Sequence, residues 1–216
     1  MDTFSCCVAF GPLGIYLLLL GVVNSSRRPL VVSGTRETLA LALAVAGLVI
    51  VGPMQLFMPQ EAATRFGNLV WPLLILFYVL ALTLVLMLSR PRIVVYNCSL
   101  DQLRPLLAVT AQQLDHDSTW AGEALSMPQL QVHLQLEHFP TMHNLSLLAT
   151  GDQQSMSGWR RLEIALRQAV RTSPVAARTH GFWLMVSGLA ILLGLAFCVA
   201  DDPQTIAQGL AHILNP

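Results

Sequence analysis

The feature that most constrains this chain is a set of four apolar stretches, at about residues 4–23, 38–57, 68–88 and 181–199. A helix of about 20 apolar residues crosses the ~30 Å hydrocarbon layer of a bilayer. Only 11% of the 216 residues are charged, whereas about a quarter is usual in a soluble domain. The sequence therefore predicts four transmembrane α-helices. The first is expected to be retained, because Asp2 precedes it where a cleaved signal would carry basic residues.

A single long polar segment interrupts these stretches and divides the chain into three parts. Residues 1–90 are predicted to hold transmembrane helices 1–3 with short loops, and residues 91–178 an inserted α+β domain. Residues 179–216 are predicted to hold the fourth helix and a short amphipathic tail, in which Ile206, Leu210 and Ile213 share one face. The links at 89–92 and 172–180 are short, so we expect the domain to lie close to the bilayer.

Local patterns within the domain predict the order β-α-β-β-β-α. The clearest strand is 130–137, where leucine or valine alternates with polar residues. Further strands are expected at 92–97, 119–125 and 142–150. One helix should begin at Ser99, whose capping-box partner is Gln102, and another near Ser157. We expect a mainly antiparallel sheet with both helices on one face.

The positions of the basic residues predict the orientation in the membrane. All twelve are arginines, a composition typical of GC-rich bacterial genes. Three lie in the first loop, one in the second, eight in the domain and its flanks, and none in the tail. Basic residues concentrate on the cytoplasmic side of membrane helices. We therefore predict a multi-pass protein of the bacterial cytoplasmic (inner) membrane, with a cytoplasmic domain and both termini outside.

Two surfaces of the domain are candidates for interaction. The polar side of the central strand carries Gln131, His133, Gln135 and Glu137, and the polar side of the last domain helix carries Arg160, Arg161, Arg167 and Arg171. Each surface also fits an ordinary solvated face. Because basic clusters near a membrane attract the anionic inner leaflet, the arginines could instead contact anionic lipid headgroups or an acidic protein.

No motif in the sequence predicts catalytic residues or a cofactor. The cysteines lack the spacing of a metal site or a redox pair, and Cys98 fits a buried apolar position at the end of a strand. The alternative is a metal site formed by His133, Glu137 and His143, which would require neighbouring strands to bring the three side chains together.

Taken together, these patterns predict a non-enzymatic interaction or assembly module. Its expected partners are the lipid bilayer, anionic headgroups and a protein of unknown identity. Nucleic acid is not expected, because the net charge is zero. The alternative function is a membrane-bound metal-dependent hydrolase. In the fourth span, Ala190, Gly194 and Cys198 recur every four residues, a pattern that predicts packing of the four spans together, with a dimer interface as the alternative.

Overall fold

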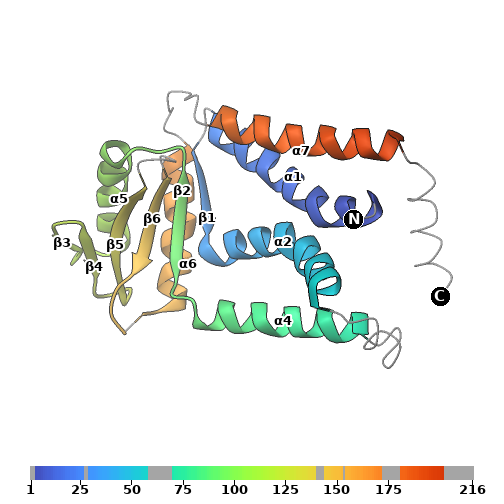
Figure 1. Cartoon of the computed structure of the whole chain (residues 1–216). Coiled ribbons are helices and arrows are strands. Elements are labelled where there is room, and N and C mark those ends of the chain that lie inside the picture. The colour runs from blue at the N-terminus through green and yellow to red at the C-terminus, as the bar shows by residue number, and fades with distance from the viewer. Residues whose placement is uncertain are drawn as a thin grey trace. The chain divides into compact units, whose positions relative to one another are not determined.

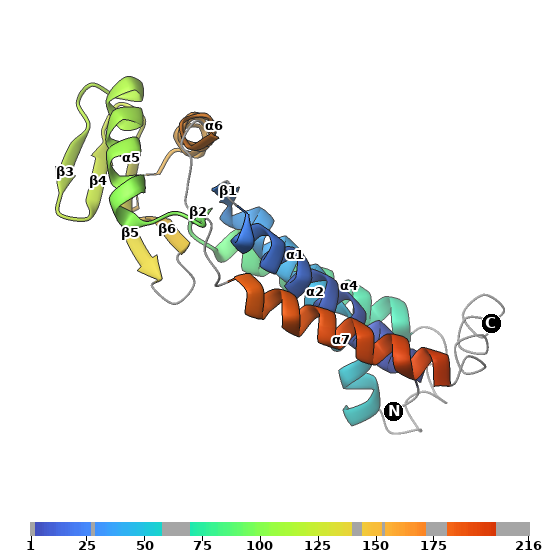
Figure 2. The same cartoon turned by 90° about the horizontal axis from the view of Figure 1, so that it is seen from above.

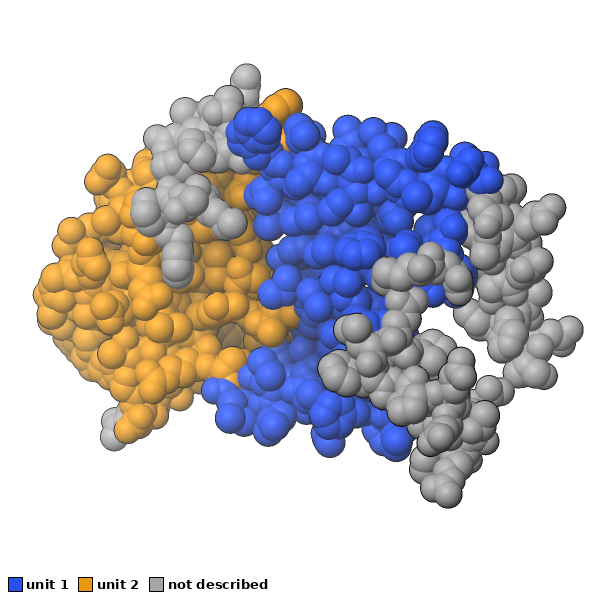
Figure 3. All heavy atoms as spheres, in the orientation of Figure 1, with its two compact units in different colours: residues 1–21, 39–88, 183–216 blue, residues 22–38, 89–182 orange. Residues whose placement is uncertain are grey.

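The computed structural model describes residues 3–26, 29–57, 70–139, 144–152, 154–171 and 181–201 (Figure 1). The chain divides into two compact units, which are coloured separately in Figure 3. The helical unit comprises residues 1–21, 39–88 and 183–216, and the sheet unit comprises residues 22–38 and 89–182. The predicted amphipathic tail lies outside the described residues.

The helical unit is built from α1 (Thr3–Ser25), α2 (Gly34–Phe57), α4 (Val70–Leu88) and α7 (Gly181–Asp201). Among the described residues, three helical segments are long and apolar enough to cross a membrane: 3–25, 34–52 and 181–201. Only 6% of the α7 segment is buried, so most of its apolar surface has no protein cover. Such surface is typical of contact with lipid. In α4, the apolar stretch Pro72–Leu88 is shorter.

Glycines mark the close approaches between these helices. A Cβ atom on Gly47 of α2 would lie 1.9 Å from the carbonyl oxygen of Val8 in α1. A Cβ atom on Gly188 of α7 would lie 2.6 Å from the amide nitrogen of Leu18 in α1, and α1 and α7 run side by side in Figures 1 and 2. Ala190, Gly194 and Cys198 of α7 are all exposed. The prediction that these residues pack the spans together was therefore wrong. Small residues allow helix backbones to touch only where the helices cross.

The sheet unit contains one six-stranded sheet in the order β1-β2-β6-β5-β4-β3, with every neighbouring pair antiparallel (Figure 2). Its strands are β1 (Leu30–Ser33), β2 (Arg92–Tyr96), β3 (Thr119–Ala121), β4 (Ala124–Met127), β5 (Val132–Phe139) and β6 (Asn144–Ala149). Two helices accompany it, α5 (Leu100–Leu114) and α6 (Met156–Arg171). The inserted α+β domain is therefore present.

One hydrophobic core joins both helices to the same face of the sheet. Alternate β5 residues Val132, Leu134 and Leu136 are buried in it together with Leu103 of α5 and Leu162 of α6. The predicted start of α5 is confirmed, because the Gln102 side chain accepts a hydrogen bond from the Ser99 amide at 3.4 Å. Both helices therefore pack on one face of the sheet, as predicted. The opposite face is left partly solvated.

Two strand predictions were wrong. The expected strand 119–125 is a hairpin of β3 and β4 that turns at Gly122, whose φ of 65° suits a residue without a side chain. The connection 24–38, expected to be a loop, contains β1, which pairs with β2 along Leu30–Ser33. β1 is therefore an edge strand of the sheet, and it lies outside the predicted domain, residues 91–178.

Candidate functional site

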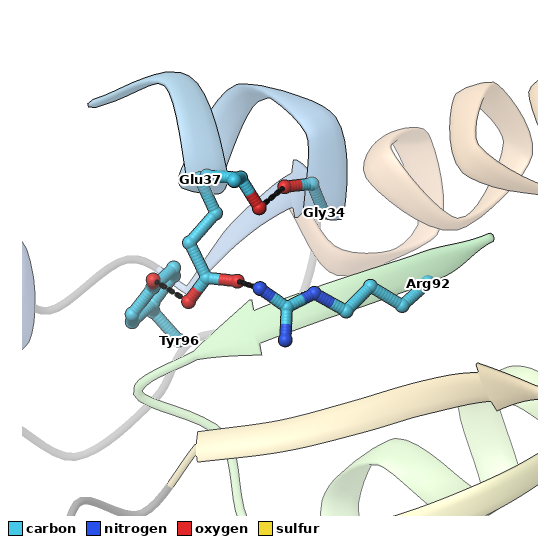
Figure 4. Close-up of polar contacts among 5 residues, drawn as sticks. Gly34, Glu37, Arg92 and Tyr96 are labelled. Atoms are coloured by element: carbon cyan, nitrogen blue, oxygen red, sulfur yellow. Dashed lines mark hydrogen bonds and ion pairs between the residues drawn. The ribbon is translucent and has the colours of Figure 1, made fainter. Parts of the chain in front are cut away.

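Glu37 of α2 joins β2 to the start of a candidate membrane helix. One carboxylate oxygen accepts a hydrogen bond of 2.6 Å from the Tyr96 hydroxyl, and the other lies 2.9 Å from the Arg92 guanidinium (Figure 4). A Cβ atom on Gly34 would clash with Cγ of Arg92, so a larger residue there would force the Arg92 side chain to move. Both of these contacts of Glu37 join α2 to β2. We therefore assign this cluster, the Glu37 junction, to holding the start of α2 against β2.

The link between β2 and α5 is also structural. Asn97 has a φ of 56°, a conformation that asparagine tolerates, and its side-chain amide donates to the carbonyl of Ser26. Next to it, the Cys98 thiol is buried, and burial raises its pKa to about 11. Because the thiolate is the nucleophile, such a thiol is inert at neutral pH.

The polar side of β5 carries three of its four predicted residues. His133, Gln135 and Glu137 alternate with the buried leucines of the strand, while Gln131 lies in the turn before it with a φ of 50°. His133 is half-buried, and its Nδ1 lies 2.9 Å from the Ser126 hydroxyl of β4. Gln135 and Glu137 are exposed. Gln131, Gln135 and Glu137 are therefore the exposed residues of this predicted surface.

The described residues supply no metal site. No three His, Cys, Asp or Glu side chains within the described part of the chain converge on one point. His133 and Glu137 are four residues apart on one strand, a separation of about 13 Å, which is too far for both to bind one ion. His143, the third predicted ligand, lies outside the described residues. The metal site therefore stays a prediction.

The four arginines of α6 have different environments. Arg160 and Arg161 are exposed near the start of the helix. Arg167 is held in place by Glu163 at 2.6 Å and donates to the carbonyl of Val31 in β1 at 3.3 Å. Arg171 is exposed in the last turn. The predicted arginine surface is thus divided into an outer pair and a pair beside the edge strand.

A pocket lies beside this second pair. It has a volume of about 290 Å³ and is lined by Pro29, Leu30, Val31, Val32, Arg36, Arg167 and Arg171. We call it the arginine pocket. From the sequence, Arg36 was counted only as one of three arginines in the first loop. Its place beside Arg167 and Arg171 depends on β1 joining the sheet, which was not predicted. Its position two residues before the predicted second span, 38–57, was the available signal.

Comparisons with protein-family models, with curated protein sequences and with solved structures gave no match. A functional conclusion therefore rests on the geometry of the chain itself. That geometry offers interaction surfaces and a cationic pocket.

Proposed function

We propose that this chain is a four-span protein of the bacterial cytoplasmic membrane whose α+β domain binds a protein partner in the cytoplasm. It would act as an interaction or assembly module rather than as an enzyme. The pairing of β1 with β2 carries the proposal. β1 lies between α1 and α2, whereas β2 follows α4. Because paired strands lie on one side of a membrane, the chain must cross an even number of times between them.

This requirement favours α4 as the fourth span. If α2 crosses the membrane, a second crossing must precede β2, and α4 is the described helix in that interval. Its 19 residues give a length of about 29 Å, and none is charged. The Tyr78 hydroxyl of α4 donates to the carbonyl of Ala42 in α2 at 2.6 Å. This hydrogen bond shows that α2 and α4 contact each other.

The arginine distribution supports a cytoplasmic domain. With four spans, eleven of the twelve arginines fall on the side that holds β1 and the domain. The remaining one, Arg65, falls in the loop between α2 and α4. Such a bias is typical of the cytoplasmic side. Both termini then lie outside the cell.

Short connections support interaction surfaces that lie close to the bilayer. Four residues separate α1 from β1, none separates β1 from α2, and three separate α4 from β2. The domain is thus connected to the spans at its edge strand and at the neighbouring strand. Its exposed polar residues include Gln135 and Glu137 on β5 and Arg160 and Arg161 on α6.

The test is purification from native membranes in a mild detergent, followed by mass spectrometry of the co-purified proteins. We expect a stoichiometric partner to co-purify with the wild-type chain and to be absent from the variant Arg160→Gln/Arg161→Gln. The matched control is Gln112→Glu/Gln113→Glu on the exposed side of α5, which lowers the net charge equally and should keep the partner. Absence of any stoichiometric partner, or equal loss from both variants, would contradict the proposal.

A further inference from the structure

The arginine pocket brings together cationic groups from separate elements of the sheet unit. Arg36 comes from the first turn of α2, and Arg167 and Arg171 come from the last two turns of α6. The remaining wall is the edge strand with the residue before it, residues 29–32. The pairing of β1 with the sheet is therefore what assembles the pocket.

Two of the three arginines in the pocket have no acidic partner among the described residues. Arg167 is paired with Glu163, but neither the Arg36 nor the Arg171 side chain forms an ion pair or hydrogen bond with another described residue. Glu37, the nearest acid in sequence to Arg36, is engaged by Arg92 and Tyr96. Arg36 also occupies a helix first turn, where the macrodipole disfavours a cation and favours an anion. An anion in the pocket would relieve both the repulsion and this dipole cost.

We propose that the arginine pocket binds the phosphate group of an anionic phospholipid. Guanidinium groups bind phosphate through paired, charge-assisted hydrogen bonds. The wall opposite the charges is apolar, and Leu30 is 43% exposed, so the glycerol and first acyl carbons have a surface to contact. Arg36 is the third residue of a helix that qualifies as a membrane span, which places it at headgroup level. The inference that the phosphate belongs to a lipid rests on the proposed membrane topology. The inference that the pocket binds a phosphate group does not.

The experiment measures lipid binding to the full-length chain in detergent by native mass spectrometry. The probes are phosphatidylglycerol, phosphatidylcholine and, for the soluble source, inorganic phosphate as a competitor. The test variant is Arg36→Gln/Arg171→Gln, in which both altered side chains are exposed and have no ion pair with another described residue, so folding is expected to survive. The matched control is Gln112→Glu/Gln113→Glu on α5, which lowers the net charge of the same unit equally outside the pocket. A thermal unfolding midpoint for each variant confirms that it is folded.

We expect the wild type to prefer phosphatidylglycerol over phosphatidylcholine. The pocket variant should bind phosphatidylglycerol at least about tenfold more weakly, since two charge-assisted contacts are lost, and the control should stay within about twofold. Inorganic phosphate that displaces the lipid at equal concentration would support the pocket but assign it to a soluble phosphate. Unchanged affinity in the pocket variant, or equal weakening in the control, would overturn the proposal. Retention of the protein partner by Arg160→Gln/Arg161→Gln would contradict the proposed function and leave the pocket proposal intact, so the two proposals fail separately.

Discussion

At the scale of single residues, the Glu37 junction joins the start of α2 to strand β2 of the sheet. Glu37 and Arg92 are only partly exposed, at 23% and 40% for their side chains, and the Tyr96 hydroxyl completes the cluster. Glu37 comes from α2 and its two partners come from β2, more than 50 residues away, so neither contact follows from local sequence. The local pattern predicted only that Arg92 begins a strand.

We predict that Tyr96→Phe lowers the free energy of unfolding by about 1 kcal/mol, because it removes one hydrogen bond to a charged acceptor. Glu37→Gln should cost about 1–2 kcal/mol, since Arg92 then loses its ionic partner. Thr35→Ala, at an exposed position in the same helical turn, is the control and should change stability little. Unfolding midpoints in detergent provide the measurement. Equal midpoints for Glu37→Gln and the control would show that the junction does not hold the sheet.

Cys98 provides a prediction about pH. Burial raises the pKa of its thiol from 9.0 to about 11, so at pH 8 the folded chain should hold about 100-fold less thiolate than the unfolded chain. In a variant that keeps only this cysteine, alkylation by iodoacetamide should be slow until denaturant is added. Since folding favours the protonated thiol, this group's contribution to stability falls as pH rises through 9 to 11. Rapid alkylation of the folded chain at pH 8 would contradict the burial of Cys98.

At the scale of elements, sequence reasoning succeeded where the signal was local. The alternation in 132–137 identified β5, and the Ser99 cap identified the start of α5. It failed for β1, because four residues between an arginine pair and a helix carry too little pattern, and their partner strand lies about 60 residues away. The hairpin of β3 and β4 was missed for a similar reason, since each strand has at most four residues. The arginine pocket could not be predicted without β1.

The two sides of β1 should respond differently to truncation. Val31 is 3% exposed and belongs to the core, whereas Val32 lies on the other face and is half-exposed. Val31→Ala should lower the free energy of unfolding by about 2 kcal/mol through lost burial and a small cavity. Val32→Ala, the same chemical change one residue along, should cost less than half as much. Equal effects measured by denaturant unfolding would mean that β1 does not pack against the core as described.

The helix crossings provide a second matched pair. Gly188→Ala would place a Cβ atom 2.6 Å from the backbone of α1, so the two helices must separate. Gly194→Ala meets nothing within 4 Å, and alanine is the better helix former by up to about 1 kcal/mol. We therefore expect a lower unfolding midpoint for Gly188→Ala and an equal or higher one for Gly194→Ala. The reverse order would mean that α1 and α7 do not cross at Gly188.

At the scale of the whole molecule, strand pairing and membrane crossing constrain each other. The number of spans was predicted only by counting apolar segments. Within the described residues, three helices are long and apolar enough to cross a membrane. The β1–β2 pairing adds the condition that 30–33 and 92–96 share one side. This condition links a short edge strand to the topology of the entire chain. Interaction surfaces, partner binding and lipid binding all depend on which side that is.

The most direct test of this central claim is the accessibility of single cysteines in spheroplasts to a membrane-impermeant maleimide. In a background without the four native cysteines, one cysteine replaces Thr35 beside β1, another replaces Gln135 in the domain, and a third replaces Ala63 between α2 and α4. We predict that Thr35→Cys and Gln135→Cys react only after permeabilisation, whereas Ala63→Cys reacts in intact spheroplasts. Labelling of Thr35→Cys and Gln135→Cys from opposite sides would contradict the β1–β2 pairing and the four-span topology with it.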